Sequence, residues 1–302
     1  MTQTRDLGVE SGVGVTALMV AAARAIETHR PDSLAADPYA EHFVRAAAAS
    51  VAWPTRPWEV PDGDADPLWG RLGRYFGLRT RVLDDFLLHA AATGVRQVVL
   101  LGAGLDTRAY RLPWPAGQVV HEVDRGGVLA FKDQVLGALA GDPCAPVPMA
   151  PAPRRRVVAA DVGHDWAGPL MASGFDPTAP TAWLAEGLLL YLPPEVELRL
   201  LRTIDDLSAA GSVLAYEVKL GLGTFQSRAN PVYAAAREQI GVDLLALFDR
   251  RPRPDSIGLL GKLRWHVTVR TPYDFARCHG RGPRPEPDDA LATNRWVFAA
   301  KP

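Results

Sequence analysis

The segment that most constrains the fold is VVLLGAG at residues 98–104, a short apolar run that ends in a glycine-rich turn. A run of this length and composition is typical of a parallel strand that is buried on both faces. Because glycine has no Cβ, Gly102 and Gly104 allow a ligand to approach the backbone, including that of Ala103 between them. The segment therefore predicts a buried strand that leads into a ligand-binding turn.

Further strand-like runs recur along the chain, and helical patterns separate them. Besides 98–104, strands are predicted at 119–124, 156–161, 181–187, 212–218, 264–270 and 294–300. Helices are predicted at 16–30, 39–50, 80–93, 126–140, 165–173 and 194–210. This alternation indicates a Rossmann-like α/β fold, with a mostly parallel sheet of about seven strands and helices on both of its faces.

The length of 302 residues and the hydrophobic content of 48% suit one domain of this kind. We expect a single domain over 1–302, in which 1–78 form an N-terminal helical cap and 79–218 form the ligand-binding core. Residues 219–302 would then hold an inserted helical segment at 219–255 and the terminal strands.

Charge and cysteine content argue against several classes of partner. The 33 basic and 34 acidic residues nearly cancel, so no global field favours nucleic acid or an anionic membrane. Cys144 and Cys278 have no spacing typical of zinc ligands, and neither a metal nor a disulfide is expected. The N-terminal segment lacks the apolar run of a secretory signal, and no stretch is long enough to span a membrane. We therefore expect a cytoplasmic protein, and the sequence leaves its oligomeric state open.

An acidic residue follows the second predicted strand at the spacing that a bound nucleoside requires. Asp124 comes twenty residues after Gly104, where its carboxylate could accept hydrogen bonds from both ribose hydroxyls. Glu122, two residues earlier on the same face of the strand, is the alternative. Thr107 replaces the third glycine of a dinucleotide-binding motif. The carboxylate of Asp106 would repel a pyrophosphate, whereas it is compatible with the ammonium group of a methionine moiety. The pattern favours S-adenosylmethionine over NAD.

Two more acidic residues and a pair of arginines are candidates for the same site. Asp161 ends a strand where its carboxylate could accept from the exocyclic amine of adenine, and Glu186 would face the cleft between cofactor and acceptor. The alternative for both is a helix N-cap or a solvated loop acid. Arg79 and Arg81 could clamp the methionine carboxylate, or they could simply begin a solvated helix.

The sequence resembles the leucine carboxyl methyltransferase family, in particular its actinobacterial branch of S-adenosylmethionine-dependent methyltransferases. GAGLDTRAYRL and WLAEGLLLYL, which occur in this order, carry most of the resemblance. The resembling segments lie at 14–44, 79–88, 97–115, 121–132, 159–166 and 180–195. They span about the first two thirds of the chain.

The resemblance implies particular site residues. The cofactor contacts that it implies are Gly102, Asp124, Asp161 with the backbone of Val162, the arginines of RTR at 79–81, and Arg24. Arg24 would reach the methionine carboxylate, which would also compensate a cation buried among small residues. Tyr191 matches a tyrosine near the acceptor carboxylate in members that act on a protein phosphatase. The chain departs from the family pattern at Arg125, Gly163 and Leu190, which leaves the acceptor open.

Together these features predict an S-adenosyl-L-methionine-dependent O-methyltransferase that acts on a carboxylate or hydroxyl of a small molecule, with natural-product metabolites as the suggested class. Glu186 and Tyr191 are the catalytic candidates. A carboxylate acceptor is already ionised at neutral pH, whereas a phenol or alcohol would need a base such as Glu186 or a histidine. The alternatives are a protein C-terminal carboxyl methyltransferase, a nicotinamide-dependent Rossmann oxidoreductase, and a protein of this fold that binds the cofactor without methyl transfer.

Overall fold

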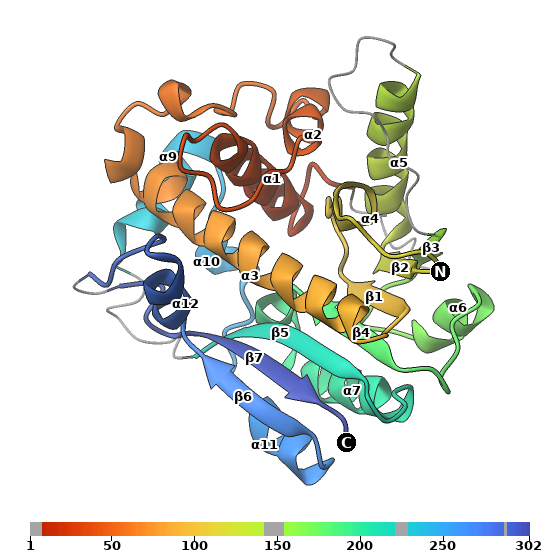
Figure 1. Ribbon diagram of the computed structural model, residues 1–302. Helices are drawn as coiled ribbons and strands as arrows, with labels where there is room; N and C mark the ends of the chain where they lie inside the picture. Colours follow the sequence, from red (N-terminus) through yellow and green to blue (C-terminus); the bar gives the residue numbers. More distant parts are fainter. Residues whose placement is uncertain (1–7, 142–153, 221–228, 287–288) are drawn as a thin grey trace, which may run out of the picture.

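A mixed β-sheet forms the centre of the molecule, as the computed structural model shows (Figure 1). The structure describes residues 8–141, 154–220, 229–286 and 289–302, and in these the sheet has seven strands in the order β3-β2-β1-β4-β5-β7-β6. The strands are β1 (Gln97–Leu101), β2 (Val119–Asp124), β3 (Arg154–Ala159), β4 (Thr181–Ala185), β5 (Val213–Lys219), β6 (His266–Arg270) and β7 (Asn294–Ala300). β1 to β5 are parallel, and β7 is antiparallel to both of its neighbours, β5 and β6. The predicted fold class is confirmed.

Apolar side chains of the parallel strands are buried on both faces of the sheet. In β1, Val98 and Leu100 pack with α3 (Gly73–Ala92), which crosses the front of the sheet in Figure 1. Val99 and Leu101 point to the opposite face, because successive side chains of a strand alternate. That face is covered by α6 (Ala167–Ala172), α7 (Pro194–Asp206) and α11 (Ser256–Lys262). Burial on both faces explains why β1 and β4 are largely apolar in the sequence, whereas β3 at the edge of the sheet is not.

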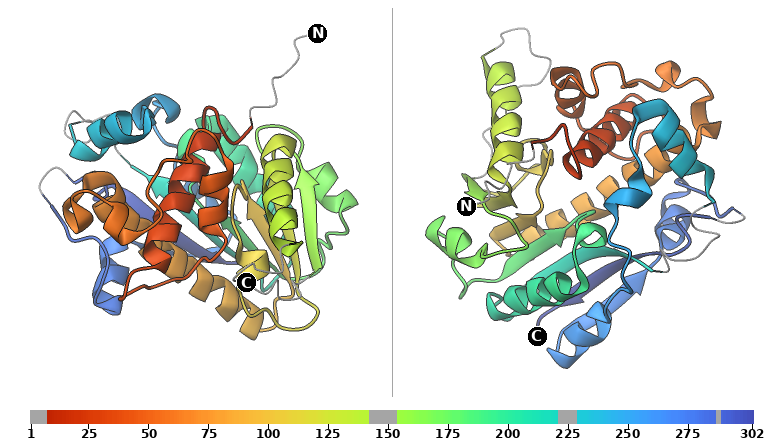
Figure 2. Two further views of the ribbon diagram at one scale, coloured as in Figure 1. Left: turned by 90° about the horizontal axis from the view of Figure 1, so that it is seen from above. Right: turned by 180° about the vertical axis from the view of Figure 1, so that it is seen from behind.

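A third apolar cluster, besides those on the two faces of the sheet, holds the N-terminal cap together. The cluster combines side chains of α1 (Gly14–Thr28), α2 (Ala40–Ala46) and the first turns of α3 with those of α9 (Pro231–Ile240) and α10 (Leu244–Leu247). The side chains of Leu18 and Ile26 in this cluster are fully buried. Figure 2 shows α9 beside this cap although it comes from the late part of the chain. The remaining helical elements are η1 (Pro57–Glu59), η2 (Gly63–Ala65), η3 (Pro67–Leu72), α4 (Arg108–Arg111), α5 (Gly126–Ala140), η4 (Leu189–Tyr191) and α12 (Pro272–His279).

The helix predicted at 80–93 is longer than its apolar pattern indicates, since α3 begins at Gly73. Glycine weakens helix propensity, so Gly73 and Gly77 obscure the first turns in the sequence. At Gly77, a Cβ would lie 2.7 Å from the side chain of Glu27 in α1. The glycine therefore serves the close approach of the two helices rather than a break between them. The helix predicted at 39–50 is instead shorter, because α2 ends at Ala46.

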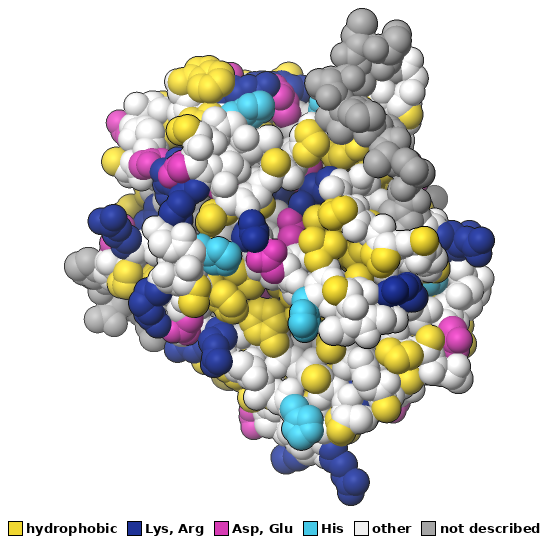
Figure 3. Space-filling view, viewed as in Figure 1, with side chains coloured by type: hydrophobic (Ala, Val, Ile, Leu, Met, Phe, Trp, Pro, Cys, Tyr) yellow, Lys and Arg dark blue, Asp and Glu magenta, His cyan; other side chains and the backbone are white. Residues whose placement is uncertain are grey.

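The surface carries charges of both signs. On the face in Figure 3, basic side chains are dispersed with acidic ones among them. Over the described ranges, no helix is long and apolar enough to cross a membrane, and no group of three or more His, Cys, Asp or Glu side chains could hold a metal ion. Cys278 is exposed with a free thiol, and Cys144 lies outside the described residues.

Candidate functional site

A cavity of about 370 Å³ lies at the carboxyl ends of the parallel strands, between the sheet and the cap. Its size falls in the range typical of small-molecule sites. The segments that follow β1, β2, β3 and β4 line one half, and α1 and α3 face them from the cap. The other half lies at the end of β5, where α9, α10 and residues 290–294 complete the wall. Because parallel strands all end at this edge, residues far apart in sequence meet here.

The turn after β1 adopts the conformation that its glycines predict. Gly102 has a φ of +64° and Gly104 a φ of +48°, a left-handed conformation that glycine adopts without steric cost. Ala103 lies between them in the cavity wall, and its N–H donates to the carbonyl of Val123 at 3.1 Å. This bond ties the turn to the end of β2.

Asp124 lines the cavity beside this turn. Its Oδ2 accepts the N–H of Gly104 at 2.6 Å and its Oδ1 accepts the N–H of Arg125 at 2.7 Å. Burial raises the pKa of Asp124 above the usual value, against these two hydrogen bonds that lower it. A carboxylate offers about four acceptor positions, so two remain for a ligand.

Glu122, the alternative to Asp124, lies outside the cavity wall. Its carboxylate is fully buried and pairs with Lys132 at 2.8 Å and Arg155 at 2.7 Å. Glu122 lies on the same face of β2 as Asp124, but two residues before the end of the strand. The candidate role of Glu122 in ribose binding is therefore not supported by its position.

The turn after β3 brings Asp161 and Val162 to the cavity. Val162 is buried, whereas 48% of the Asp161 side chain is exposed. Asp161 Oδ1 accepts the N–H of Gly163 at 2.7 Å. Asp161 thus combines a turn-stabilising role with a position at the cavity.

Glu186, which follows β4, is the centre of a buried charge cluster. Its Oε1 lies 2.8 Å from Arg24 Nη2 and 2.9 Å from Arg79 Nε, and its Oε2 lies 2.6 Å from Arg108 Nη1. Less than a tenth of each of these four side chains is exposed. The cluster joins α1, α3 and α4 to the end of β4.

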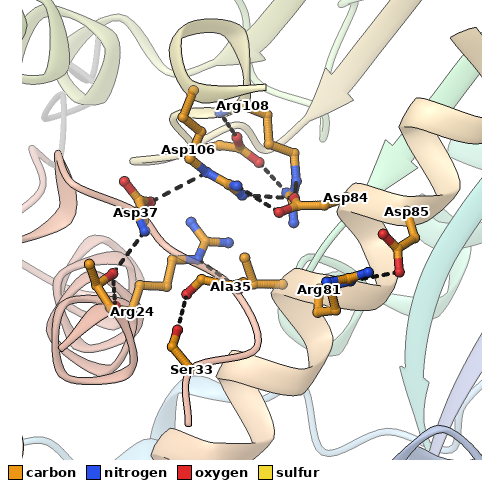
Figure 4. A network of polar contacts seen from close by, with 12 residues as sticks. Arg24, Ser33, Ala35, Asp37, Arg81, Asp84, Asp85, Asp106 and Arg108 are labelled. Carbon is orange, nitrogen blue, oxygen red and sulfur yellow. Dashed lines mark hydrogen bonds and ion pairs between the residues drawn. The ribbon is translucent and has the colours of Figure 1, made fainter. Parts of the chain in front are cut away.

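Other carboxylates extend this cluster (Figure 4). Arg108 also pairs with Asp106 and with Asp84, the latter at 2.7 Å from its Nε. Arg79 Nη1 lies 2.8 Å from Glu217, which accepts the Tyr75 hydroxyl at 2.6 Å. Arg108 was not among the predicted site residues, although its place just after the glycine turn was the available signal.

The structure changes the expected roles of the arginines. Arg24 and Arg79 converge as predicted, but on the carboxylate of Glu186, so a protein carboxylate already compensates Arg24. Arg81 is outside the cavity wall and pairs with Asp85 at 2.8 Å, with 45% of its side chain exposed (Figure 4). The prediction that Arg81 joins this site is wrong, because residues two apart on a helix point to different sides.

The two catalytic candidates differ in what they can do. Burial alone would raise the pKa of Glu186, but Arg108, Arg24 and Arg79 outweigh it and hold this pKa well below the usual value. Since a general base needs a pKa near the working pH, Glu186 is unsuited to that role. Burial raises the pKa of Tyr191 to about 12, against a hydrogen bond with Thr16 that lowers it, so its phenol stays protonated in the cavity wall. No histidine lines the cavity within the described part of the chain.

Comparison with known proteins places this chain in a family. The sequence model described as leucine carboxyl methyltransferase matches residues 17–205. A protein of Streptomyces coelicolor, named "Putative S-adenosyl-L-methionine-dependent methyltransferase", is 60% identical over 297 residues, which are 98% of this chain and 95% of the relative. A protein of the same name from Saccharopolyspora erythraea is 44% identical over 267 residues, which cover 88% of each chain.

Solved structures share the fold at low sequence identity. A crystal structure titled as a methyltransferase from Thermobifida fusca has a TM-score of 0.52 and 20% identity, over 86% of this chain and 94% of that one. A DUF574 family protein from Streptomyces avermitilis has a TM-score of 0.52 and 16% identity, over 90% of this chain and all of that one. At these identities the likeness concerns the fold alone.

Proposed function

The chain belongs to the leucine carboxyl methyltransferase family and is an S-adenosyl-L-methionine-dependent methyltransferase, and from this premise we propose that it methylates an oxygen atom of a small-molecule acceptor. The observation that carries this proposal is the continuity of the cavity. One half lies at the glycine turn and the strand-end acids, and the other is lined mainly by apolar side chains of α9, α10 and neighbouring segments. Cofactor and acceptor would bind in these two halves.

The residues present in the first half fit the cofactor. Gly102 and Gly104 give access to the backbone, and Asp124 retains acceptor positions for two ribose hydroxyls. Asp161 and Val162 would bind the adenine at the next strand end. This order follows the strand order β3-β2-β1-β4 along the sheet edge.

The charge cluster would bind the methionine end. Arg24 has its Nε and Nη2 engaged by Thr80 and Glu186, which leaves Nη1 for a ligand carboxylate. Asp106 and Glu186 line the same part of the cavity and would accept from the ammonium group. Arg79 would act by holding Glu186 in place.

The second half is suited to a small, largely apolar acceptor. Its wall includes Leu190, Tyr191, Tyr233, Leu244 and Phe248. The ring centroids of Tyr191 and Phe248 lie 5.7 Å apart, so two segments distant in sequence close this side. These aromatic and aliphatic walls suit a small, largely apolar molecule.

The chemistry needs positioning more than acid–base catalysis. The bound cofactor supplies a methyl group on a sulfonium, which is already activated for displacement. The protein would hold the acceptor oxygen about 3–3.5 Å from that methyl carbon, and Tyr191 could orient it by hydrogen bonding. Since Glu186 cannot act as a base, a carboxylate acceptor, ionised at neutral pH, fits this site better than an alcohol.

The test is methyl transfer from S-adenosylmethionine labelled in its methyl group. We would offer small apolar carboxylic acids and phenols, and separately peptides that end in a free leucine carboxylate. The proposal predicts label in small molecules, as base-labile esters where the acceptor is an acid. Label that enters only the peptides would support the protein carboxyl methyltransferase instead. Binding of the cofactor without any transfer would support a non-catalytic role.

A point change outside the cavity should leave cofactor binding intact. Arg81→Ala is expected to keep the affinity for S-adenosylhomocysteine within about twofold, because the exposed Arg81–Asp85 pair is remote from the cavity wall. Isothermal titration calorimetry measures this affinity. A loss of tenfold or more, roughly 1.4 kcal/mol, would return Arg81 to the site.

A further inference from the structure

Lys219, the last residue of β5, lies in the wall of the acceptor half although only 8% of it is exposed. Its Nζ donates to Asn294 Oδ1 at 2.9 Å and to the carbonyl of Ala290. Lys219 and Asn294 are paired residues of the antiparallel strands β5 and β7, so the sheet itself fixes this contact. The ammonium group is therefore held rigidly at the end of the sheet.

Lys219 differs from the other buried cations in its partners. Arg24, Arg79, Arg108 and Lys132 each lie within 3 Å of a carboxylate oxygen, for example 2.8 Å between Lys132 and Glu122. Within the ranges that the structure describes, Lys219 has no carboxylate oxygen within 4.0 Å. Both of its hydrogen bonds are to neutral oxygens. A buried charge without a counter-charge is costly to a protein.

The two carboxylates whose charge acts on the Lys219 ammonium are engaged by other groups. Glu217 accepts from Tyr75 and Arg79 at 2.6 and 2.8 Å. Asp289 pairs with Arg71 at 2.7 Å and also accepts the hydroxyl of Tyr273. Neither carboxylate is therefore free to move to Lys219.

The ammonium group retains a donor for a ligand. An ammonium group has three N–H donors, and the protein accepts two of those of Lys219. The surrounding cavity wall is largely apolar, with Val232, Tyr233, Leu244 and Leu291. Glu217 and Arg79 also line the cavity, but they pair with each other at 2.8 Å, so Lys219 is the cation there without a paired carboxylate among the described residues. A largely apolar wall with such a cation is complementary to an apolar molecule that carries one negative charge.

We propose that Lys219, held by Asn294, binds a carboxylate of the methyl acceptor, and that the acceptor is a small apolar carboxylic acid. This inference rests on the proposed function, because it assumes that the half of the cavity at β5 holds the acceptor. Lys219 acts as an anchor that selects acceptor charge, and the remaining apolar walls select acceptor size.

The test compares Lys219→Met with Lys262→Met, a matched removal of an exposed lysine at the end of α11. The probes are straight-chain and phenyl-substituted acids of six to twelve carbons, each paired with its primary amide. Calorimetry would measure their binding to protein saturated with S-adenosylhomocysteine. We expect the wild type and Lys262→Met to bind at least one acid about tenfold more tightly than its amide, as one charge-assisted hydrogen bond provides. Lys219→Met should lose this preference and keep its affinity for S-adenosylhomocysteine.

The dependence on pH gives a second measurement. Burial lowers the pKa of Lys219 to about 8, against Glu217 and Asp289, which raise it. The neighbouring phenols of Tyr75 and Tyr233 have raised pKa values and stay neutral. The preference for acids should therefore be full well below pH 8 and decline as the pH rises through about 8, because the ammonium deprotonates. Lys219→Arg should keep the preference at high pH, because guanidinium stays charged.

The outcomes separate this inference from the proposed function. Acids that bind no better than amides, or a preference that survives Lys219→Met, would overturn the anchor. Labelled methyl transfer to small molecules, measured in parallel, would show whether the proposed function still holds. If acids bind through Lys219 but accept no label, Lys219 is a carboxylate-binding residue, and both its assignment to the methyl acceptor and the proposed function fail.

Discussion

Replacing Glu186 with glutamine is expected to lower the free energy of unfolding by about 3–5 kcal/mol, the cost of breaking a buried ion pair by removal of one partner. The carboxylate of Glu186 contacts Arg24, Arg79 and Arg108 in one enclosed cluster. Arg79 and Arg108 keep other carboxylates after the change. Arg24 loses the one carboxylate that it contacts among the described residues. Chemical denaturation followed by circular dichroism measures the effect.

The matched control is Glu195→Gln, which breaks an exposed pair with Arg251. There 63% of the glutamate side chain and 51% of the arginine side chain are exposed, so no measurable change is expected. Adding Arg24→Met to Glu186→Gln should restore part of the lost stability, since it removes the uncompensated cation. Equal effects of Glu186→Gln and Glu195→Gln would contradict the importance of burial in this cluster.

The same cluster explains how the cap is joined to the sheet. Arg24 belongs to α1, Arg79 to α3 and Arg108 to α4, while Glu186 follows β4. The apolar cluster of the cap reaches the sheet at Trp296 of β7, and Phe298 packs against both this cluster and the cluster under α3. Buried charges therefore supplement apolar packing at this junction. We expect cap and sheet to unfold together, because opening the junction would leave several charges without partners.

The central strands β1 and β4 could be predicted from the sequence because they are buried on both faces of the sheet. The predicted bounds of 119–124 and 294–300 coincide with β2 and β7, and 126–140 coincides with α5. The start of α3 could not be predicted, since Gly77 looks like a helix breaker until Glu27 of α1 is seen against it. The helix propensity of the local sequence does not reflect that tertiary contact.

Candidate site residues could be predicted from the sequence where the strand topology alone determines their position. Gly102, Asp124 and Asp161 follow strands that end at one edge, and all three line the cavity. A correct prediction for the arginines of α3 requires knowing which side of this helix faces the sheet. The sequence does not show this, and Arg81 was therefore wrongly included. Lys219 was also missed, since the sequence does not show which side chain at the end of β5 lies beside Asn294.

Replacing Asp124 with alanine is expected to weaken binding of S-adenosylhomocysteine by more than about 100-fold. Two ribose hydroxyls would each donate to an ionised acceptor, and such bonds contribute about 1.5–3 kcal/mol each. The change also leaves the N–H of Gly104 without the oxygen that it contacts at 2.6 Å, which loosens the turn. Isothermal titration calorimetry gives the affinity, and circular dichroism shows whether the sheet stays folded.

Two aspartates near the next strand end provide the comparison. Asp161→Ala should weaken binding by less than about tenfold, because backbone contacts to the adenine at Val162 would survive a loss of roughly one hydrogen bond. Asp165, which accepts the N–H of Gly168 at 3.1 Å and lies outside the cavity wall, should tolerate alanine without any change in affinity. If Asp124→Ala behaves like Asp165→Ala while the protein stays folded, the ribose is bound elsewhere. The order of cofactor groups along the sheet edge would then have to be reassigned.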